Sequence, residues 1–313
     1  MTKESLNDTL CGVWSASPTP FTRKMEIDIQ SIERMVEHHI KLGVKGLFLA
    51  GTCGEGAWMT NDQRRQLVQN TVKYAKGRLT LAVQVTDNSS ARILDNIKQT
   101  QDDGADIAVI APPYFLPLQS PKHLLDLYQT AIRKSPLPIG IYDRGKNGEV
   151  IVPNQVLKEI YQEKKVILVK DSSADMERMK IALAVKKKRP TLRLLTGWEF
   201  NTVVYMQNGY DGMLLGGGIF NGFMAGQIIA AVQEGNIDQA NKIQQKMNRI
   251  MYQVFGGKKV KCWLSGQKKL LVEMGIFNTW KSYLNYPLAP SCEKAIKTIV
   301  KKYNNILTPW KGN

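Results

Sequence analysis

Eight short runs rich in β-branched and aliphatic residues recur along the chain, and most are followed by a polar turn and an amphipathic stretch. The runs begin at Gly12, Gly46, Thr80, Ile107, Ile139, Val166, Arg193 and Gly212. Their spacing leaves room for one helix in most of the gaps. Eight strands that alternate with helices predict a (β/α)8 barrel, the TIM barrel of the α/β class. An open, doubly wound sheet is the alternative, but no GxGxxG motif follows the first run.

Residues with capping preferences mark the ends of the intervening helices. Between Asp28 and Gly43, four aliphatic residues recur at helical spacing. Asp28 is therefore expected as the N-cap of a helix and Gly43 as the glycine that ends it. Thr60 and Gln63 have the spacing of a capping box at the start of the next helix.

The alternation of predicted strands and helices stops in the last eighty or so residues. Their sequence predicts helices, for example from Asn236 to Phe255. We expect residues 1–230 to form the barrel and residues 231–313 to form a helical extension packed against it. The length of 313 residues suits a single barrel of this kind.

The composition is that of a globular protein, with 43% hydrophobic and 22% charged residues. No apolar run approaches the roughly 18 residues needed to cross a bilayer. The first ten residues, MTKESLNDTL, lack the apolar core of a signal peptide. Four cysteines lie far apart without a CxxC pair, which argues against a zinc site or a disulfide framework. We therefore expect a cytoplasmic protein without a metal site or a membrane partner.

The formal net charge of +16 is the unusual bulk property. A basic balance is compatible with a nucleic-acid partner or with attraction of acidic substrates. The cations are scattered in short runs such as VKKKR and KKVK, without a basic tail or the aromatic-basic interleaving of an RNA-binding module. We interpret them as a solvated basic surface and expect no nucleic-acid partner. A basic nucleic-acid-binding protein is kept as the non-enzyme alternative.

Lys170 directly follows the aliphatic residues of the sixth run, VILVK. A lysine at the end of such a strand either reaches solvent or places its amine at the edge of the hydrophobic core. Burial lowers the pKa of an amine and makes it available as a nucleophile near neutral pH. The barrel favours the second interpretation, because the carboxyl ends of its strands line the active site.

Other polar side chains are expected at the same rim. Thr52 follows the second run, Tyr114 the fourth, Tyr142 ends the fifth and Glu199 follows the seventh. A lysine amine can form an imine with a ketone, and a tyrosine can carry the proton that the reaction moves. The glycine-rich string AGTCGEG around Thr52 supplies backbone N–H groups for a carboxylate. The lysine and the tyrosines together predict carbonyl chemistry, and the carboxylate of a 2-oxo acid would suit the glycine-rich turn.

The whole set resembles the dihydrodipicolinate synthase / N-acetylneuraminate lyase family of pyruvate-dependent class I aldolases. The resemblance extends over nearly the whole chain. In order, it rests on Pro18-Thr19-Pro20-Phe21, Gly51-Thr52-Cys53-Gly54-Glu55, Pro112-Pro113-Tyr114, Tyr142, Lys170-Asp171-Ser172 and the segment GYDGMLL at 209–215.

The resemblance implies a role for each matching position. Lys170 would form the Schiff base, and Tyr142 would donate and accept the proton. Thr52 and the backbone of Cys53 would hold the pyruvate carboxylate, and Thr52 would also orient the Tyr142 hydroxyl. Tyr114 would reach a neighbouring subunit in a homotetramer built as a dimer of dimers. The resemblance implies no cofactor, organic or metal, and further substrate contacts are expected from Leu214, Arg144, Ser172 and Glu199.

Departures from the family pattern bear on the second substrate. Cys53 replaces the usual second threonine of the carboxylate turn. The loop YDRGKNG has Asp143 where an asparagine is usual, and it lacks the usual proline. Neither Arg144 nor Lys146 falls in register with the arginine of true dihydrodipicolinate synthases. Glu199 is one acidic group where sialic acid lyases have two.

We therefore expect an aldolase or lyase that joins or cleaves a carbon–carbon bond between pyruvate and an aldehyde, on a 2-oxo-3-deoxy sugar acid or a related 2-oxo acid. Asp143, Ser172, Glu199 and Asn221 are candidate partners for a hydroxylated chain. The first alternative is 4-hydroxy-tetrahydrodipicolinate synthase, which condenses pyruvate with aspartate semialdehyde. A dehydratase or deaminase using the same imine, and a family member that has lost turnover, remain open.

Overall fold

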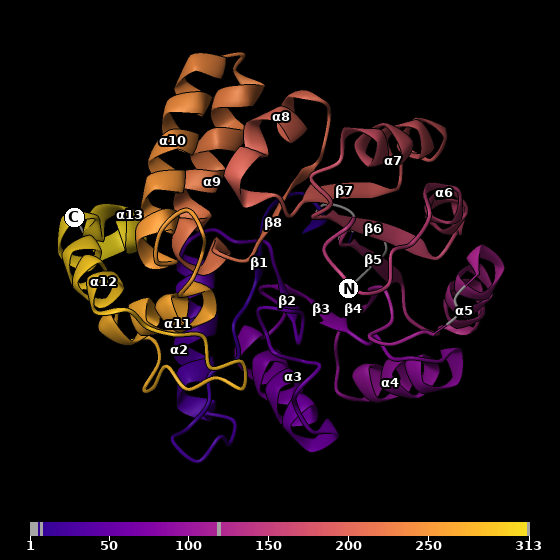
Figure 1. Cartoon of the computed structure of the whole chain (residues 1–313), viewed down its shortest axis with the longest axis horizontal. Coiled ribbons are helices and arrows are strands. Elements are labelled where there is room, and N and C mark those ends of the chain that lie inside the picture. The colour runs from indigo at the N-terminus through magenta and orange to yellow at the C-terminus, as the bar shows by residue number, and fades with distance from the viewer. Residues whose placement is uncertain (1–5, 7–8, 118–119, 312–313) are drawn as a thin grey trace.

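The structure is a computed structural model that describes residues 6, 9–117 and 120–311. Eight parallel strands form a closed barrel in which each strand pairs with the next in sequence and the last pairs with the first (Figure 1). The strands are β1 (Gly12–Ala16), β2 (Gly46–Leu49), β3 (Thr80–Gln84), β4 (Ile107–Ile110), β5 (Ile139–Asp143), β6 (Val166–Asp171), β7 (Arg193–Thr196) and β8 (Gly212–Leu215). All eight begin where the sequence predicts, and the TIM barrel is confirmed.

The helices form the outer layer around the strands (Figure 1). They are α2 (Ile29–Lys41), α3 (Asn61–Ala75), α4 (Ser90–Asp102), α5 (Pro121–Lys134), α6 (Asn154–Gln162), α7 (Met176–Lys188), α8 (Thr202–Gln207) and α9 (Gly218–Gln233). A short 3-10 helix, η1 (Glu199–Asn201), precedes α8.

The predicted caps are present. The Asp28 carboxylate accepts a hydrogen bond from the Ser31 N–H (3.2 Å), and Gly43 has a positive φ of 75° just after α2. At the start of α3, Thr60 and Gln63 exchange backbone-to-side-chain hydrogen bonds of 3.1 and 3.2 Å. Such caps satisfy N–H groups that the first turn of a helix leaves without a partner.

Large side chains fill the interior of the barrel. Trp14, Phe48, Leu168, Leu195 and Leu214 form one buried cluster there, and Tyr142 belongs to the same cluster. Two further clusters lie between the strands and the surrounding helices. Because the interior is packed, space for a ligand is left only at the ends of the barrel.

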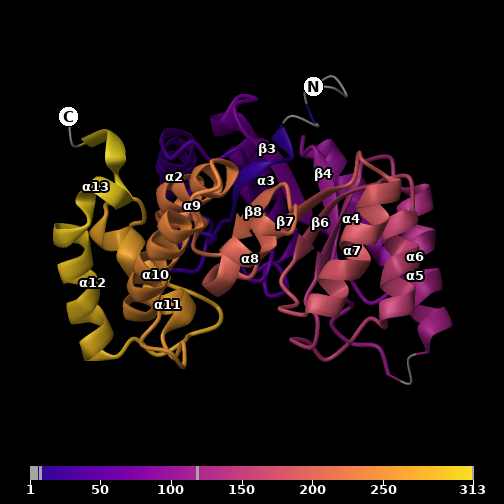
Figure 2. The ribbon, with the colours of Figure 1, turned by 90° about the horizontal axis from the view of Figure 1, so that it is seen from above.

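The last helices form an extension along one side of the barrel (Figure 2). They are α10 (Ile237–Val254), α11 (Trp263–Glu273), α12 (Pro290–Lys302), α13 (Asn304–Leu307) and the 3-10 helix η2 (Pro309–Lys311). The predicted helix at Asn236 to Phe255 is α10, with these two residues as its caps.

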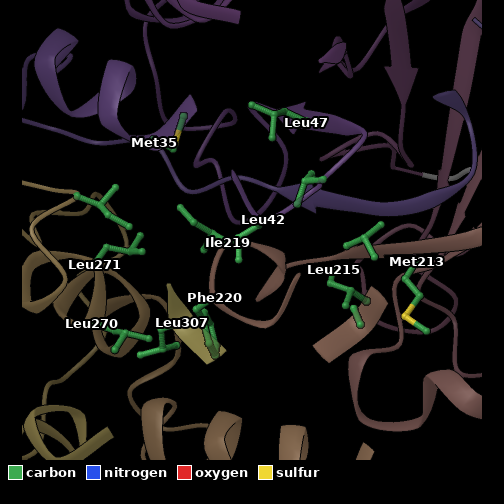
Figure 3. Close-up of a cluster of buried hydrophobic side chains, with 14 of the residues drawn as sticks. Met35, Leu42, Leu47, Met213, Leu215, Ile219, Phe220, Leu270, Leu271 and Leu307 are labelled. Carbon is green, nitrogen blue, oxygen red and sulfur yellow. The ribbon is translucent and has the colours of Figure 1, made fainter. Parts of the chain in front are cut away.

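The extension and the barrel share one hydrophobic core. Leu270 and Leu271 of α11 and Leu307 of α13 lie in the same buried cluster as Ile219 and Phe220 of α9 (Figure 3). Helix α9 continues to residue 233. The predicted boundary at residue 230 therefore falls in its last turn, and the division into two parts stays a prediction. No helix in the described part of the chain is long and apolar enough to cross a membrane.

Candidate active site

Lys170 and Tyr142 lie side by side near the carboxyl ends of neighbouring strands. The parallel pairing of β5 with β6 aligns the two residues directly. The Lys170 Nζ lies 4.2 Å from the ring centroid of Tyr142 and 4.8 Å from that of Phe48. Both residues are buried, at 5% and 7% exposure. The amine is thus held against two aromatic faces near the carboxyl ends of the strands.

A cavity of about 480 Å³ opens above this pair. Residues from six segments of the chain line it: Thr52, Cys53, Tyr142, Arg144, Asn147, Lys170, Ser172, Gly197, Trp198, Glu199, Phe200, Gly216, Val260 and Trp263. The structure therefore brings Lys170, Tyr142 and Thr52 to one cavity. No hydrogen bond joins the Thr52 and Tyr142 hydroxyls among the described residues, so the orienting role of Thr52 stays a prediction.

The residue after each member of the pair is a buried aspartate that anchors its strand. Asp143 accepts a hydrogen bond from the guanidinium of Arg178 (2.6 Å), and Asp171 accepts one from the Tyr210 hydroxyl (2.6 Å). Burial raises the pKa of Asp143, while the charge of Arg178 opposes this shift. Asp143 does not line the cavity. The hypothesis that it binds a hydroxylated substrate is therefore replaced by an anchoring role.

Gly197 lets two neighbouring strands bring their side chains together. A Cβ at this position would lie 2.0 Å from the Ser172 Oγ and 3.1 Å from the Lys170 Cε. Only a glycine leaves room for both groups, so Ser172 reaches the cavity beside the lysine.

Glu199 faces the same cavity from the turn after β7. Its Oε2 accepts a hydrogen bond from the Gly217 N–H (2.7 Å) at the start of α9. Burial raises the pKa of Glu199 to about 7, although this hydrogen bond and the positive charge of Lys170 act in the opposite direction. Near neutral pH this carboxyl group can therefore either donate or accept a hydrogen bond.

Thr52 and Cys53 line the cavity from the turn after β2. Burial raises the pKa of the Cys53 thiol to about 12, while the charge of Lys170 opposes the rise. The thiol stays protonated at neutral pH and has little nucleophilic character. Cys53 is thus a neutral part of the wall.

A second cavity of about 390 Å³ adjoins the first, and Thr52 and Arg144 line both. Tyr114 lines the second cavity, where its hydroxyl accepts a hydrogen bond from the Gln84 Nε2 (2.8 Å). Tyr114 does not line the cavity of Lys170. Its predicted role towards a neighbouring subunit stays a prediction.

The remaining residues predicted for the site do not line the cavity of Lys170. Lys146 is exposed and lines neither cavity, in contrast to Arg144. The side chain of Leu214 belongs to the barrel interior, and Asn221 is fully buried in α9 outside both cavities. The substrate contact expected of Leu214 stays a prediction.

Sequence reasoning missed several residues of the wall. Trp198 and Phe200 flank Glu199, and Asn147 lies in the loop after β5. Val260 and Trp263 come from the extension. No local pattern could have placed these two at the rim, because a contact between segments this far apart in sequence leaves no periodic signal.

Known proteins resemble this chain over nearly its whole length. A family profile described as "Dihydrodipicolinate synthetase family" matches residues 9–305. A 4-hydroxy-tetrahydrodipicolinate synthase of Thermotoga neapolitana is 26% identical over 92% of this chain and 96% of its own. An N-acetylneuraminate lyase of Salmonella agona is 25% identical over 94% of this chain and 93% of its own.

A solved structure supports the fold. The dihydrodipicolinate synthase of Bacteroides thetaiotaomicron superposes with a TM-score of 0.84 and 25% identity, over 93% of this chain and 98% of its own. The profile covers almost the whole chain, so the resemblance inferred from the motifs is confirmed. The chain belongs to the dihydrodipicolinate synthetase family.

Proposed function

We propose that this chain is a class I aldolase or lyase that uses Lys170 to form a Schiff base with pyruvate. The observation that supports this proposal most is the alignment of Lys170 with Tyr142 in one cavity. Family membership confirms the prediction of a pyruvate-dependent enzyme of carbon–carbon bond chemistry, because the relatives are synthases and lyases of this kind. Nothing in the comparisons supports the nucleic-acid-binding alternative.

The reaction follows from the positions of the two side chains. The Lys170 amine adds to the C2 carbonyl of pyruvate, and loss of water leaves the imine. The protonated imine passes a proton of its methyl group to Tyr142 and becomes an enamine, which attacks the aldehyde carbon of the partner. This leaves a product iminium, which water hydrolyses to free Lys170. The Tyr142 phenol gives its proton to the alkoxide that forms, and cleavage is the same sequence in reverse. Thr52 and the backbone of Cys53 hold the carboxylate of pyruvate.

The second substrate binds above the imine, where Ser172, Glu199 and Arg144 reach the cavity. Ser172 and Glu199 suit the hydroxyl groups of a sugar-derived aldehyde. This favours cleavage or formation of a 2-oxo-3-deoxy sugar acid. Arg144 suits a distal carboxylate instead, and this observation favours the alternative, 4-hydroxy-tetrahydrodipicolinate synthase acting on aspartate semialdehyde.

Two measurements test the proposal. Pyruvate with borohydride should add a stable three-carbon adduct to Lys170 in the wild type, as read by peptide mass spectrometry. An adduct of equal yield in Lys170→Ala would assign the imine to another lysine. A panel of sialic acid, 3-deoxy sugar acids and hydroxy-oxoglutarates, assayed for pyruvate release beside condensation with aspartate semialdehyde, would identify the second substrate.

We also propose a homotetramer in the cytoplasm. Exposed aromatic side chains support an interface beside the second cavity, since Tyr114 and Phe115 are 40% and 68% exposed in the single chain. Light scattering coupled to gel filtration should give a mass near four chains, and a monomer would contradict this part of the proposal.

A further inference from the structure

Three side chains of helix α11, in the extension, point towards the catalytic end of the barrel. Trp263 lines the substrate cavity. The Gln267 Nε2 donates a hydrogen bond to the carbonyl oxygen of Gly216 (2.7 Å), in the turn after β8. The Lys268 ammonium forms an ion pair with Glu55, in the turn after β2. One helix thus contacts two turns that belong to the wall of the cavity.

The Glu55–Lys268 pair is fully buried, with both side chains at 0% exposure. Besides the ammonium, the Glu55 carboxylate accepts hydrogen bonds from the Ser282 hydroxyl (2.8 Å) and from the Tyr283 N–H (2.6 Å). Lys268 also donates to the carbonyl oxygen of Lys281 (2.8 Å). All these partners lie in the extension. Through Glu55, the extension therefore holds the turn after β2, which contains Thr52 and Cys53 and is called the carboxylate turn below.

These contacts of Glu55 constrain the backbone of the turn. Glu55 has a φ of +58°, in the left-handed region that side chains other than glycine rarely adopt. Its N–H donates to the carbonyl oxygen of Thr52 (3.2 Å), and the Thr19 hydroxyl donates to that of Gly54 (2.6 Å). A Cβ at Gly56 would lie 1.9 Å from the carbonyl oxygen of Ala50. The turn is therefore tight, and a shift of Glu55 must move Thr52.

A buried ion pair is a poor device for stability alone, because apolar side chains of similar volume often stabilise a protein equally well. It does fix the relative position of two segments. The turns that α11 contacts follow β2 and β8, which flank β1 in the barrel. Both turns contribute to the cavity wall, through Thr52 and through Gly216.

We infer that α11 positions the carboxylate-binding turn, and that Glu55 and Lys268 are positioning residues for the carboxylate of the 2-oxo acid. The inference rests on the proposed function, since it presumes that Thr52 and Cys53 bind this carboxylate. Neither residue touches the substrate. Each acts through the backbone of the turn.

The test compares Lys268→Met with Lys269→Met. Lys269 is the next residue of α11, and its ion pairs with Glu273 (2.9 Å) and Glu293 (3.1 Å) remain within the extension. Lys268→Met leaves Glu55 without its cation and should raise the pyruvate Kd measured by calorimetry about tenfold or more, since small displacements of a binding group are costly. Lys269→Met should leave the Kd within about twofold.

Methyl pyruvate lacks the free carboxylate of pyruvate. It therefore distinguishes a loss of carboxylate positioning from general damage to the active site. Its half-saturating concentration for borohydride trapping on Lys170 should be the same in the wild type and in Lys268→Met. An equal loss for pyruvate and methyl pyruvate, or an unchanged pyruvate Kd in Lys268→Met, would overturn the inference.

A milder variant covers the case in which Lys268→Met does not fold. Ser282→Ala removes one hydrogen bond to Glu55 and keeps the ion pair, so it should raise the pyruvate Kd by about two- to fivefold. An unchanged Kd would again overturn the inference. If the wild type binds pyruvate but gives no adduct, the proposed chemistry fails while the Kd comparison still decides the positioning role. An adduct with equal Kd values refutes the positioning role alone.

Discussion

The amine of Lys170 meets the ring of Tyr142 because residues 140–143 of β5 pair in register with residues 168–171 of β6, after a register shift between Ile139 and Gly140. A shift of one residue would turn one of the side chains to the opposite face of the sheet. The buried aspartates that follow them, Asp143 and Asp171, hold this register through Arg178 and Tyr210. The proposed catalytic geometry of Lys170 and Tyr142 is thus fixed by contacts on the far side of the strands.

Replacing Tyr142 with phenylalanine should leave the imine and remove the proton carrier. We expect the borohydride adduct to form at a similar level while kcat falls by roughly 10² to 10⁴, the usual contribution of positioned proton transfer. Single-turnover trapping and steady-state assays on the same sample measure both quantities. A near-normal kcat in Tyr142→Phe would assign the proton to another group.

Arg144 and Lys146 form a matched pair for the question of the second substrate, because only Arg144 lines the cavities. If the partner carries a distal carboxylate, Arg144→Ala should raise its KM by an amount equivalent to roughly 1.5 to 3 kcal/mol. Lys146→Ala should not change it. Both variants are assayed with a carboxylated and an uncarboxylated aldehyde, and equal kinetics throughout would leave the loop without a recognition role.

Glu199 should make the enzyme sensitive to pH near neutrality. Its pKa of about 7 means that the carboxyl group is protonated below this pH and ionised above it. If the ionised form accepts hydrogen bonds from a hydroxylated aldehyde, kcat/KM for that substrate should rise with pH through about 7. Glu199→Gln should lose this inflection, as a pH profile would show. A profile with the same inflection in the variant would assign the titration elsewhere.

At the scale of elements, the regular parts of the structure were predictable and the long-range contacts were not. Every strand start follows from a run of aliphatic residues, and the caps at Asp28 and Thr60 follow from local spacing. Trp263 begins a helix, WLSGQKKLLVE, whose sequence carries no motif that points to the cavity. Glu55 looks like an ordinary turn residue until its partner Lys268, 213 residues away, is known.

The turn after β7 offers a test at this scale. In Gly197→Ala, the new Cβ would meet the Ser172 Oγ at 2.0 Å and the Lys170 Cε at 3.1 Å. The Ser172 hydroxyl must then rotate away or the β7 turn must shift, and the Lys170 side chain must move by a few tenths of an ångström. We expect the rate of adduct formation to fall by about tenfold or more, since near-attack geometry is lost. Gly226→Ala in α9, where a Cβ meets nothing within 4 Å, is the control. Equal rates in the two variants would contradict a clash between a side chain at residue 197 and the side chains of Ser172 and Lys170.

The whole molecule should lose stability in mild acid because of two buried histidines. The ring nitrogens of His38 and His39 share hydrogen bonds with the carbonyl oxygens of Ile219 (2.6 Å) and Met35 (2.8 Å). Burial lowers the pKa of His38 to about 4 and that of His39 to about 3. Both therefore stay neutral in the folded chain at pH values at which they are charged in the unfolded chain.

These pKa values determine whether the free energy of unfolding rises or falls with pH. The unfolded state binds more protons below about pH 6.5, so each histidine lowers the free energy of unfolding by roughly 1.4 kcal/mol per pH unit until its folded pKa is reached. Urea unfolding of the wild type at pH 7, 6 and 5 should show this decline. The double variant His38→Gln, His39→Gln should have a flatter dependence, and an unchanged slope would mean that other groups dominate.

The contact between Glu55 and Lys268 also has a consequence for protein synthesis. Lys268 is translated 213 residues after Glu55. At roughly 5 to 20 residues per second, this separation corresponds to about 10 to 40 s on the ribosome. During that time the strands of the barrel can already pair, while the carboxylate turn lacks the cation that holds it. We therefore expect a nascent chain arrested before residue 268 to bind pyruvate poorly, so that tight pyruvate binding arises only after Lys268 has left the ribosome.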